Sequence, residues 1–136
     1  MMSRTSPAKS SARSAPCPVK PGVGQRRLMS PDDAARLMGL FKVFANDSRL
    51  RLLHALTRAG ELSVTELATQ LGMTAQAVSN QLQRLADKGI VANRRDGNRF
   101  LYRIADACVP ILLERGWCLI EETQKRGLAG SASDSD

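Results

Sequence analysis

Two consecutive segments, each with a capping residue at its start and a glycine at its end, restrict the fold of this chain more than any other feature. Each segment predicts a helix. The pattern of a capping box at Ser63 and Glu66 predicts the start of a short helix that ends before Gly72. Thr74 then predicts the start of a longer helix that continues to Lys88, where a second glycine follows. A short helix, a tight turn and a longer helix form the helix-turn-helix arrangement.

The hydrophobic pattern changes from helical to alternating directly after the longer helix. Ile90 and Val91 begin a stretch typical of a strand, and Asp96-Gly97 predicts a tight turn. Apolar residues then return in near alternation as far as Ile104. A β-hairpin is therefore expected directly after the helix-turn-helix unit, which is the arrangement of a winged helix.

Three more helices are expected, two before this unit and one after it. Their capping residues should be Ser30, Asn46 or Asp47, and Asp106, and their last residues about Phe44, Arg58 and Lys125. The predicted fold class is mainly α with a small β-hairpin wing, a winged helix-turn-helix with five helices.

The last of these helices carries more apolar surface than one small core can cover. Its apolar residues are Val109, Leu112, Leu113, Trp117, Leu119 and Ile120. The first helix also has an apolar stripe wider than one face. A subunit interface would bury the excess of the last helix, so we expect a homodimer.

The length of 136 residues suits one domain, which we expect over residues 30–126. Residues 1–29 hold six basic side chains and no acidic one, and they predict a disordered basic arm, either a solvated extension or a contact to phosphates. Residues 127–136 predict a disordered C-terminal tail. No apolar run approaches the about 20 residues of a membrane span, and the start lacks a secretory signal, so we expect a cytoplasmic protein. The three cysteines, at positions 17, 108 and 118, are expected to be reduced thiols.

Positive charge is concentrated in the predicted hairpin. The chain carries a net charge of +7, whereas residues 30–126 contain fourteen basic and eleven acidic side chains. Four arginines fall within ten residues of the hairpin, at Arg94, Arg95, Arg99 and Arg103, and only Asp96 opposes them. Arg95 and Arg99 flank the turn, so we expect them to contact DNA phosphates or an adjacent minor groove, with the other two assisting.

The longer helix of the helix-turn-helix unit has an apolar face and a face of uncharged polar side chains. The polar residues are Gln76, Ser79, Asn80 and Gln83. A face that is only solvated usually contains Glu and Lys, whereas amides and hydroxyls pair with the donors and acceptors on base edges in the major groove. We therefore expect these residues to read DNA, with Thr74 at the helix start anchoring a phosphate or a base.

The sequence contains no constellation typical of an enzyme. His54 is the single histidine and is expected to have a structural role, and there is no glycine-rich phosphate loop. The alternative to a DNA-binding transcriptional regulator is a winged helix that acts as a protein-protein adapter. A basic hairpin beside an amide-rich helix has no obvious use in such an adapter.

From Leu40 to Ile104, about half of the chain, the sequence resembles the ArsR/SmtB family of metal- and stress-responsive winged-helix repressors. The segments that carry the resemblance are L-F-K-V-F-A-N-D-S-R-L-R-L-L (40–53), E-L-S-V-T-E-L-A (61–68), A-V-S-N-Q-L-Q-R-L (77–85) and G-I-V-A-N-R-R-D-G-N-R-F-L-Y-R-I (89–104). The resemblance implies a dimer formed by the first and last helices, a palindromic DNA operator, and release from DNA when an inducer binds.

The inducer sites of that family transfer poorly to this chain. The C-V-C motif of its arsenic and lead sensors corresponds here to Ser63 and Thr65, so that site is absent. The D-x-H pair of its zinc, cobalt and nickel sensors corresponds to Asp106 and Cys108. The second pair of those sensors, H-x-x-[HE], corresponds to Leu119 and Glu122, with Cys118 beside it.

No cofactor is required by this prediction, but a thiolate and carboxylate site could bind zinc or cadmium as an inducer. Cys108 and Cys118 are ten residues apart, or about 15 Å along one helix. The candidate ligands Asp106, Cys108, Cys118 and Glu122 would therefore have to combine across the dimer. A thiol redox switch and ordinary buried cysteines are the alternatives.

Overall fold

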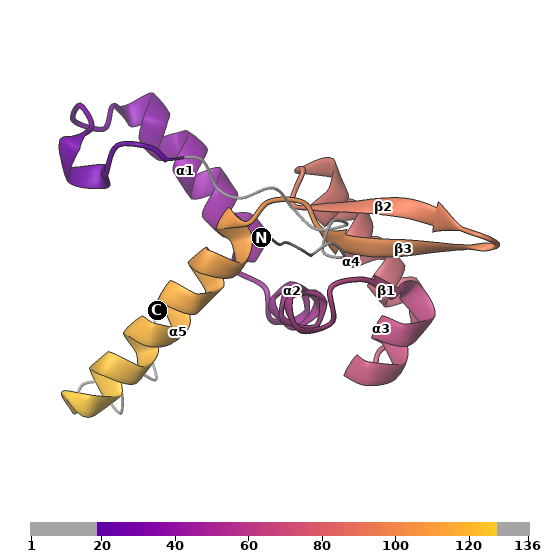
Figure 1. Cartoon of the computed structure of the whole chain (residues 1–136). Helices are drawn as coiled ribbons and strands as arrows, with labels where there is room; N and C mark the ends of the chain where they lie inside the picture. Colours follow the sequence, from indigo (N-terminus) through magenta and orange to yellow (C-terminus); the bar gives the residue numbers. More distant parts are fainter. Residues whose placement is uncertain (1–18, 128–136) are drawn as a thin grey trace, which may run out of the picture.

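The computed structural model describes residues 19–127, which form five α-helices and a three-stranded antiparallel sheet (Figure 1). In chain order the elements are a short 3-10 helix η2 (Val23–Gln25), α1 (Pro31–Phe44), α2 (Asp47–Ala59), β1 (Leu62–Ser63), α3 (Val64–Leu71), α4 (Ala75–Asp87), β2 (Val91–Asp96), β3 (Arg99–Ile104) and α5 (Cys108–Lys125). The predicted winged helix-turn-helix with five helices is confirmed. The expected N-terminal arm and C-terminal tail lie mostly outside the described residues.

Side-chain hydrogen bonds at the first residues fix where α1, α2 and α3 begin, and the capping residues are among those expected. Ser30 and Ser63 each accept a hydrogen bond from the backbone N–H three residues later, and the carboxylates of Asp33 and Glu66 accept from the serine N–H in return. These backbone hydrogen bonds lower the pKa of both carboxyls. Asn46, rather than the residue after it, caps α2.

The start of α5 differs from the prediction. Its N-cap is Ala107, which has helical backbone angles and makes no side-chain cap. Asp106, the expected cap, lies one residue earlier, and its Oδ1 still accepts a hydrogen bond from the Cys108 N–H at 2.7 Å. The aspartate therefore satisfies an N-terminal amide of α5 without being the capping residue.

The core lies between α2, α3, α4 and the sheet. Its fully buried side chains are Leu52, Leu53, Leu56, Leu67, Val78, Leu82 and Leu85. The sheet order is β1-β3-β2, so the hairpin strand β3 is central. The short strand β1, which the sequence analysis did not predict, pairs with β3 through Leu62 opposite Tyr102. This pairing joins the wing to the start of α3.

The turn between α3 and α4 needs a residue that tolerates a left-handed backbone. Gly72 has φ of 65° and ψ of 36°, and its N–H donates to the Ala68 carbonyl. After this turn, α4 packs against α2, α3 and strand β2 of the hairpin (Figure 1). Within residues 19–127, no helix has both the length and the apolar character that crossing a membrane needs.

Replacing Glu66 with Gln should alter how stability depends on pH. The Ser63 N–H lowers the pKa of Glu66 in the folded chain, so its charged form stabilises the fold above the unfolded pKa of about 4.3 and this contribution is lost as the pH falls through the folded pKa. We expect the wild type to exceed Glu66→Gln in free energy of unfolding at pH 7, and the difference to shrink below about pH 4. Urea unfolding between pH 3 and 7 measures this, with the exposed Glu114→Gln as control. A difference that stays constant with pH would contradict it.

Candidate nucleic-acid interface

Helix α4 separates its apolar and polar side chains onto opposite faces. Val78, Leu82 and Leu85 have no exposed surface, and their spacing of four and three residues keeps them on the side facing the core. The five residues expected to read DNA are all exposed, and these are Thr74, Gln76, Ser79, Asn80 and Gln83. The structure therefore brings these five residues together on the solvent side of one helix.

Two hydrogen bonds hold the amides of this face in place. Gln76 Nε2 donates to Asn80 Oδ1 at 3.0 Å, and Gln83 Nε2 donates to Asp87 Oδ1 at 3.1 Å. Each bond uses only part of the capacity of an amide, which has two N–H donors and a carbonyl acceptor. Gln76 and Asn80 thus keep both donor and acceptor groups available while their side chains are held side by side.

Thr74 begins this helix as its N-cap. Its Oγ1 accepts a hydrogen bond from the Ala77 N–H at 3.0 Å, so the hydroxyl proton stays available as a donor. The position at the start of a helix of 13 residues also places it where free backbone amides favour an anion. This geometry suits contact with a DNA phosphate.

The wing presents Arg95 and Arg99 on either side of its turn. Arg95 Nε donates to the Gly97 carbonyl at 3.1 Å, and its guanidinium lies 5.5 Å from the centre of the Phe100 ring. Arg99 lies 3.8 Å from carboxylate oxygens of both Glu66 and Asp96, at the edge of ion-pair distance, and half of its side chain is exposed. Both arginines lie near the hairpin tip. Among the described residues no carboxylate lies within ion-pair distance of Arg95, whereas Arg99 has two carboxylates at the edge of that distance.

Arg94 differs from these two arginines because a carboxylate already binds it. Its Nε and Nη2 donate to the two oxygens of Glu61 at 2.8 and 2.9 Å, a bidentate ion pair that lowers the pKa of Glu61. Arg94 is one of the arginines expected to assist DNA binding. Its pair with Glu61 was not predictable, because the two residues are 33 positions apart in sequence. The pairing of β1 with β3 brings the two side chains together.

Arg49 connects helix α4 to α1, a role that was not predicted from the sequence. Its Nε donates to the Val43 carbonyl at 2.7 Å and its Nη2 to the Lys42 carbonyl at 3.5 Å, both in the last turn of α1. Its Nη1 donates to Gln81 Oε1 on α4 at 2.9 Å. One guanidinium therefore links the C-terminal end of α1 to the middle of α4.

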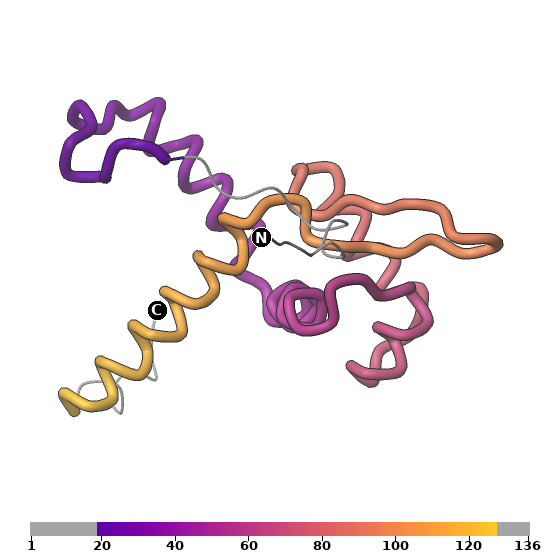
Figure 2. Tube along the Cα trace, in the orientation of Figure 1, coloured from indigo at the N-terminus to yellow at the C-terminus, as the bar shows by residue number. Residues whose placement is uncertain are grey.

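Helices α1 and α5 project from the core on the side away from the hairpin tip (Figure 2). Both expose large apolar side chains, which are Leu37, Met38, Leu40 and Phe41 on α1 and Ile111, Trp117, Leu119 and Ile120 on α5. Trp117 is 64% and Leu119 is 61% exposed, so neither belongs to the core of this subunit. The apolar excess expected from the sequence is present on both helices.

The residues expected to hold a metal do not come together within one subunit. No group of three or more His, Cys, Asp and Glu side chains in residues 19–127 is placed to hold a metal ion. Asp106 and Cys108 lie at the start of α5, whereas Cys118 and Glu122 lie in its second half, where Glu122 pairs with Lys125 at 3.3 Å. The donors are spread along α5, as the distance along one helix predicted.

The cysteines differ from the expected set of reduced thiols. Cys108 is disulfide-bonded, whereas Cys118 is a free and partly buried thiol. The expectation for Cys17 lies outside the described residues. A sulfur atom in a disulfide is not a thiolate ligand, and Leu119 occupies another ligand position. Within one subunit the donors of α5 therefore depart from the pattern of the zinc, cobalt and nickel sensors.

A family model described as MarR family matches residues 46–98, from the cap of α2 to the turn of the hairpin. The "Transcriptional repressor SmtB homolog" of Synechocystis sp. is 40% identical over 82 residues, covering 60% of this chain and 61% of that protein. The chain thus spans less than two thirds of the length of that relative. The MarR model covers less than half of this chain, so the relatives and solved structures decide the family.

Two solved structures match over nearly their whole length. The AntR antimony-specific transcriptional repressor is 55% identical with a TM-score of 0.67, covering 80% of this chain and 98% of that chain. The second is the homodimeric winged helix-turn-helix DNA-binding domain of Mb0332 from Mycobacterium bovis, which is described as a possible ArsR-family transcriptional regulator. It is 33% identical with a TM-score of 0.62, and the match covers 74% of this chain and 95% of that chain. The chain belongs to the ArsR/SmtB family of winged helix-turn-helix transcriptional regulators.

Proposed function

We propose that this protein binds duplex DNA as a homodimer and represses transcription. The observation that carries the proposal is the exposed row of amide and hydroxyl side chains on α4, on the face opposite its three fully buried residues. A helix of this kind fits the major groove, where base edges present both donors and acceptors. The relatives named as transcriptional repressors support the same function rather than an adapter or an enzyme.

We assign base reading to Gln76, Ser79, Asn80 and Gln83, and a phosphate contact to Thr74. Amide side chains pair in a bidentate manner with the N6 and N7 atoms of adenine. The hydrogen bond between Gln76 and Asn80 orients these two side chains on the exposed face of α4. Arg95 and Arg99 would bind the backbone or an adjacent minor groove from the wing.

A second copy of the chain would cover the apolar faces of α1 and α5. The homodimeric state of the Mb0332 domain supports this arrangement. Two recognition helices related by a two-fold axis would then read two half-sites of a palindrome.

We infer that an inducer acts through metal or thiol chemistry on α5. The solved structure named as an antimony-specific repressor supports a response to a metal or metalloid, and zinc or cadmium stay the proposed metals. The donors of this chain support chemistry at sulfur, through Cys108 and Cys118, better than a site of zinc-sensor type.

The salt dependence of DNA binding tests the proposal. A dimer in which Arg95 and Arg99 contact phosphates makes up to four such contacts from its wings, and each contributes about 0.9 to the slope of log affinity against log salt. Replacing both arginines with Ala should therefore reduce that slope by about two to four. Fluorescence anisotropy with the upstream region of the protein's own gene, between 50 and 300 mM salt, measures the change.

The matched control removes an arginine that the fold already neutralises. The double variant Arg94→Ala with Glu61→Gln leaves the net charge unchanged and deletes the bidentate ion pair, so its slope should stay within one of the wild-type value. Binding to DNA that does not depend on salt, or no binding at all, would favour the adapter function.

A further inference from the structure

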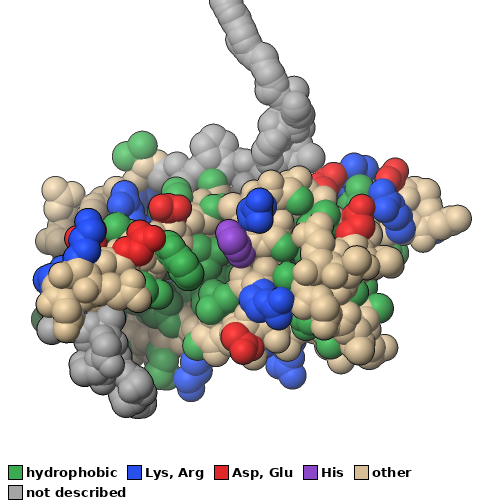
Figure 3. All heavy atoms as spheres, turned by 90° about the horizontal axis from the view of Figure 1, so that it is seen from below, with side chains coloured by type: hydrophobic (Ala, Val, Ile, Leu, Met, Phe, Trp, Pro, Cys, Tyr) green, Lys and Arg blue, Asp and Glu red, His purple; other side chains and the backbone are tan. Residues whose placement is uncertain are grey.

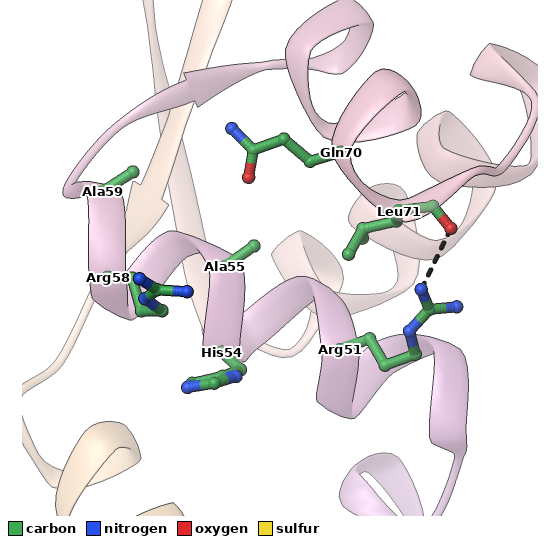
Figure 4. Close-up of a pocket in the computed structure, with 7 residues that line it drawn as sticks. All are labelled: Arg51, His54, Ala55, Arg58, Ala59, Gln70 and Leu71. Atoms are coloured by element: carbon green, nitrogen blue, oxygen red, sulfur yellow. Dashed lines mark hydrogen bonds between the residues drawn. The ribbon is translucent and has the colours of Figure 1, made fainter.

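An open hollow of about 460 Å³ lies between α2 and α3, outside the DNA-reading face of α4. Its lining residues are Arg51, His54, Ala55, Arg58, Ala59, Gln70 and Leu71. In Figure 4, Gln70 extends from α3 toward α2, on which Ala55 and Ala59 carry small side chains. The small side chains of the two alanines keep this space open. Its volume falls in the range of roughly 300–1,000 Å³ that small-molecule sites occupy.

The hollow is lined by basic side chains and by no acidic one. Arg51, His54 and Arg58 follow one another on the exposed side of α2 at spacings of three and four residues. Figure 3 looks onto this side of the molecule, where the histidine (purple) lies between basic side chains (blue). Among the residues that the structure describes, neither arginine has a carboxylate within ion-pair distance. The positive charge here is therefore not neutralised by the fold.

Most of the hydrogen-bond donors around the hollow are also available. Arg51 Nη2 donates to the Leu71 carbonyl at 3.0 Å, which orients the guanidinium but uses one of its five N–H donors. No hydrogen bond from the side chain of Arg58 or Gln70 occurs within residues 19–127. The side chains of Arg51, Arg58 and Gln70 thus offer many hydrogen-bond donors to the hollow and only one acceptor, the amide oxygen of Gln70.

We propose that this hollow binds a small molecule with two or more anionic groups, of the class of phosphate esters and di- or tricarboxylates. Arg51 and Arg58 are seven residues apart, about 10 Å along the helix, so they suit the two ends of an elongated anion better than a single oxyanion. Leu71 is the last residue of α3, directly before the turn at Gly72 that leads into α4. The ligand would bind next to the segment that orients the recognition helix.

Titration of the reduced full-length protein with citrate, without DNA, tests this site. In ¹H–¹⁵N NMR spectra, amides of residues 51–59 and 70–71 should shift in a saturable manner. Arg58→Ala should raise the dissociation constant about tenfold or more, because it removes charge-assisted hydrogen bonds. Ala59→Leu keeps every charge but fills the hollow, and it should weaken citrate binding to a similar extent.

Arg126→Ala, which removes the same charge at the end of α5, is the matched control and should leave the dissociation constant within twofold of the wild type. Equal loss in Arg126→Ala and Arg58→Ala, or no saturable shift at residues 51–59, would overturn the proposal. A further experiment distinguishes a free small-molecule anion from a phosphate of the DNA backbone as the ligand of the hollow. If Arg58→Ala reduces the salt slope of DNA binding while citrate gives no saturable shift, the hollow is a phosphate contact of the DNA complex and the small-molecule site is wrong.

Discussion

Replacing Ile120 with Glu should convert the proposed homodimer into a monomer and lower the affinity for a palindromic operator by about 10²- to 10⁴-fold. Val109, Leu113, Gly116 and Ile120 are spaced by four, three and four residues along α5, so they form one stripe. Val109 is buried in the core and Leu113 packs against it, whereas Ile120 is 48% exposed. A carboxylate there costs little in the monomer but is unpaired and desolvated in a dimer.

The loss of affinity follows because each subunit carries one recognition helix. When two linked half-sites no longer bind together, the gain from effective concentration disappears. Sedimentation equilibrium measures the oligomeric state, and anisotropy measures operator affinity. Gln124→Glu adds the same charge at another exposed position of α5 and should leave both unchanged. An Ile120→Glu protein that stays dimeric would show that the subunit interface lies elsewhere.

Replacing Arg49 with Ala should lower the free energy of unfolding by about 2–3 kcal/mol, since hydrogen bonds from a charged donor contribute about 1.5–3 kcal/mol. The change deletes the bonds to the Val43 and Lys42 carbonyls of α1 and to Gln81 of α4. Arg49→Lys should recover little of this loss, because an ammonium cannot reach partners on two helices as the planar guanidinium fork does. Urea unfolding of the dimer at a fixed protein concentration measures these differences.

Gln81→Ala separates the link to α4 from the link to α1. It removes only one of the three acceptors of Arg49, so we expect the free energy of unfolding to fall by about 1 kcal/mol. The double variant Arg49→Ala with Gln81→Ala should show a coupling energy of similar size between the two residues. Arg115→Ala, an exposed arginine of α5, is the matched control and should stay within about 0.5 kcal/mol of the wild type. If Arg49→Ala is no more destabilising than this control, the contacts of Arg49 do not hold α1 and α4 together.

The helix boundaries were predictable because the interactions that set them join residues no more than four positions apart. The capping serines Ser30 and Ser63, the stop at Gly72 and the cap at Thr74 all lie where the sequence placed them. The recognition face was predictable for the same reason, since a helical period of 3.6 residues sorts side chains onto faces without knowledge of the rest of the fold. The misplaced cap at Asp106 shows the precision of such rules, which is about one residue at a helix end.

Contacts between distant residues could not be derived in this way. Strand β1 consists of two residues and exists only because β3, about 40 residues later, provides its hydrogen-bond partners. The ion pair between Glu61 and Arg94, which removes one arginine from the expected DNA contacts, depends on that pairing. The disulfide-bonded state of Cys108 was likewise not predicted.

The sequence by itself determined which segments are helices, which helix presents amides and hydroxyls, and where positive charge is concentrated, because these properties depend on local hydrogen bonds and periodicity. The tertiary structure alone decided which partner each arginine has. Arg95 lies beside Gly97 and Phe100 at the tip of the wing, and Arg99 lies at the edge of ion-pair distance from Glu66 and Asp96. Arg94 forms a bidentate ion pair with Glu61, and Arg49 joins two helices. A charged side chain acts according to the partner within about 4 Å of it, and only the folded backbone sets that distance.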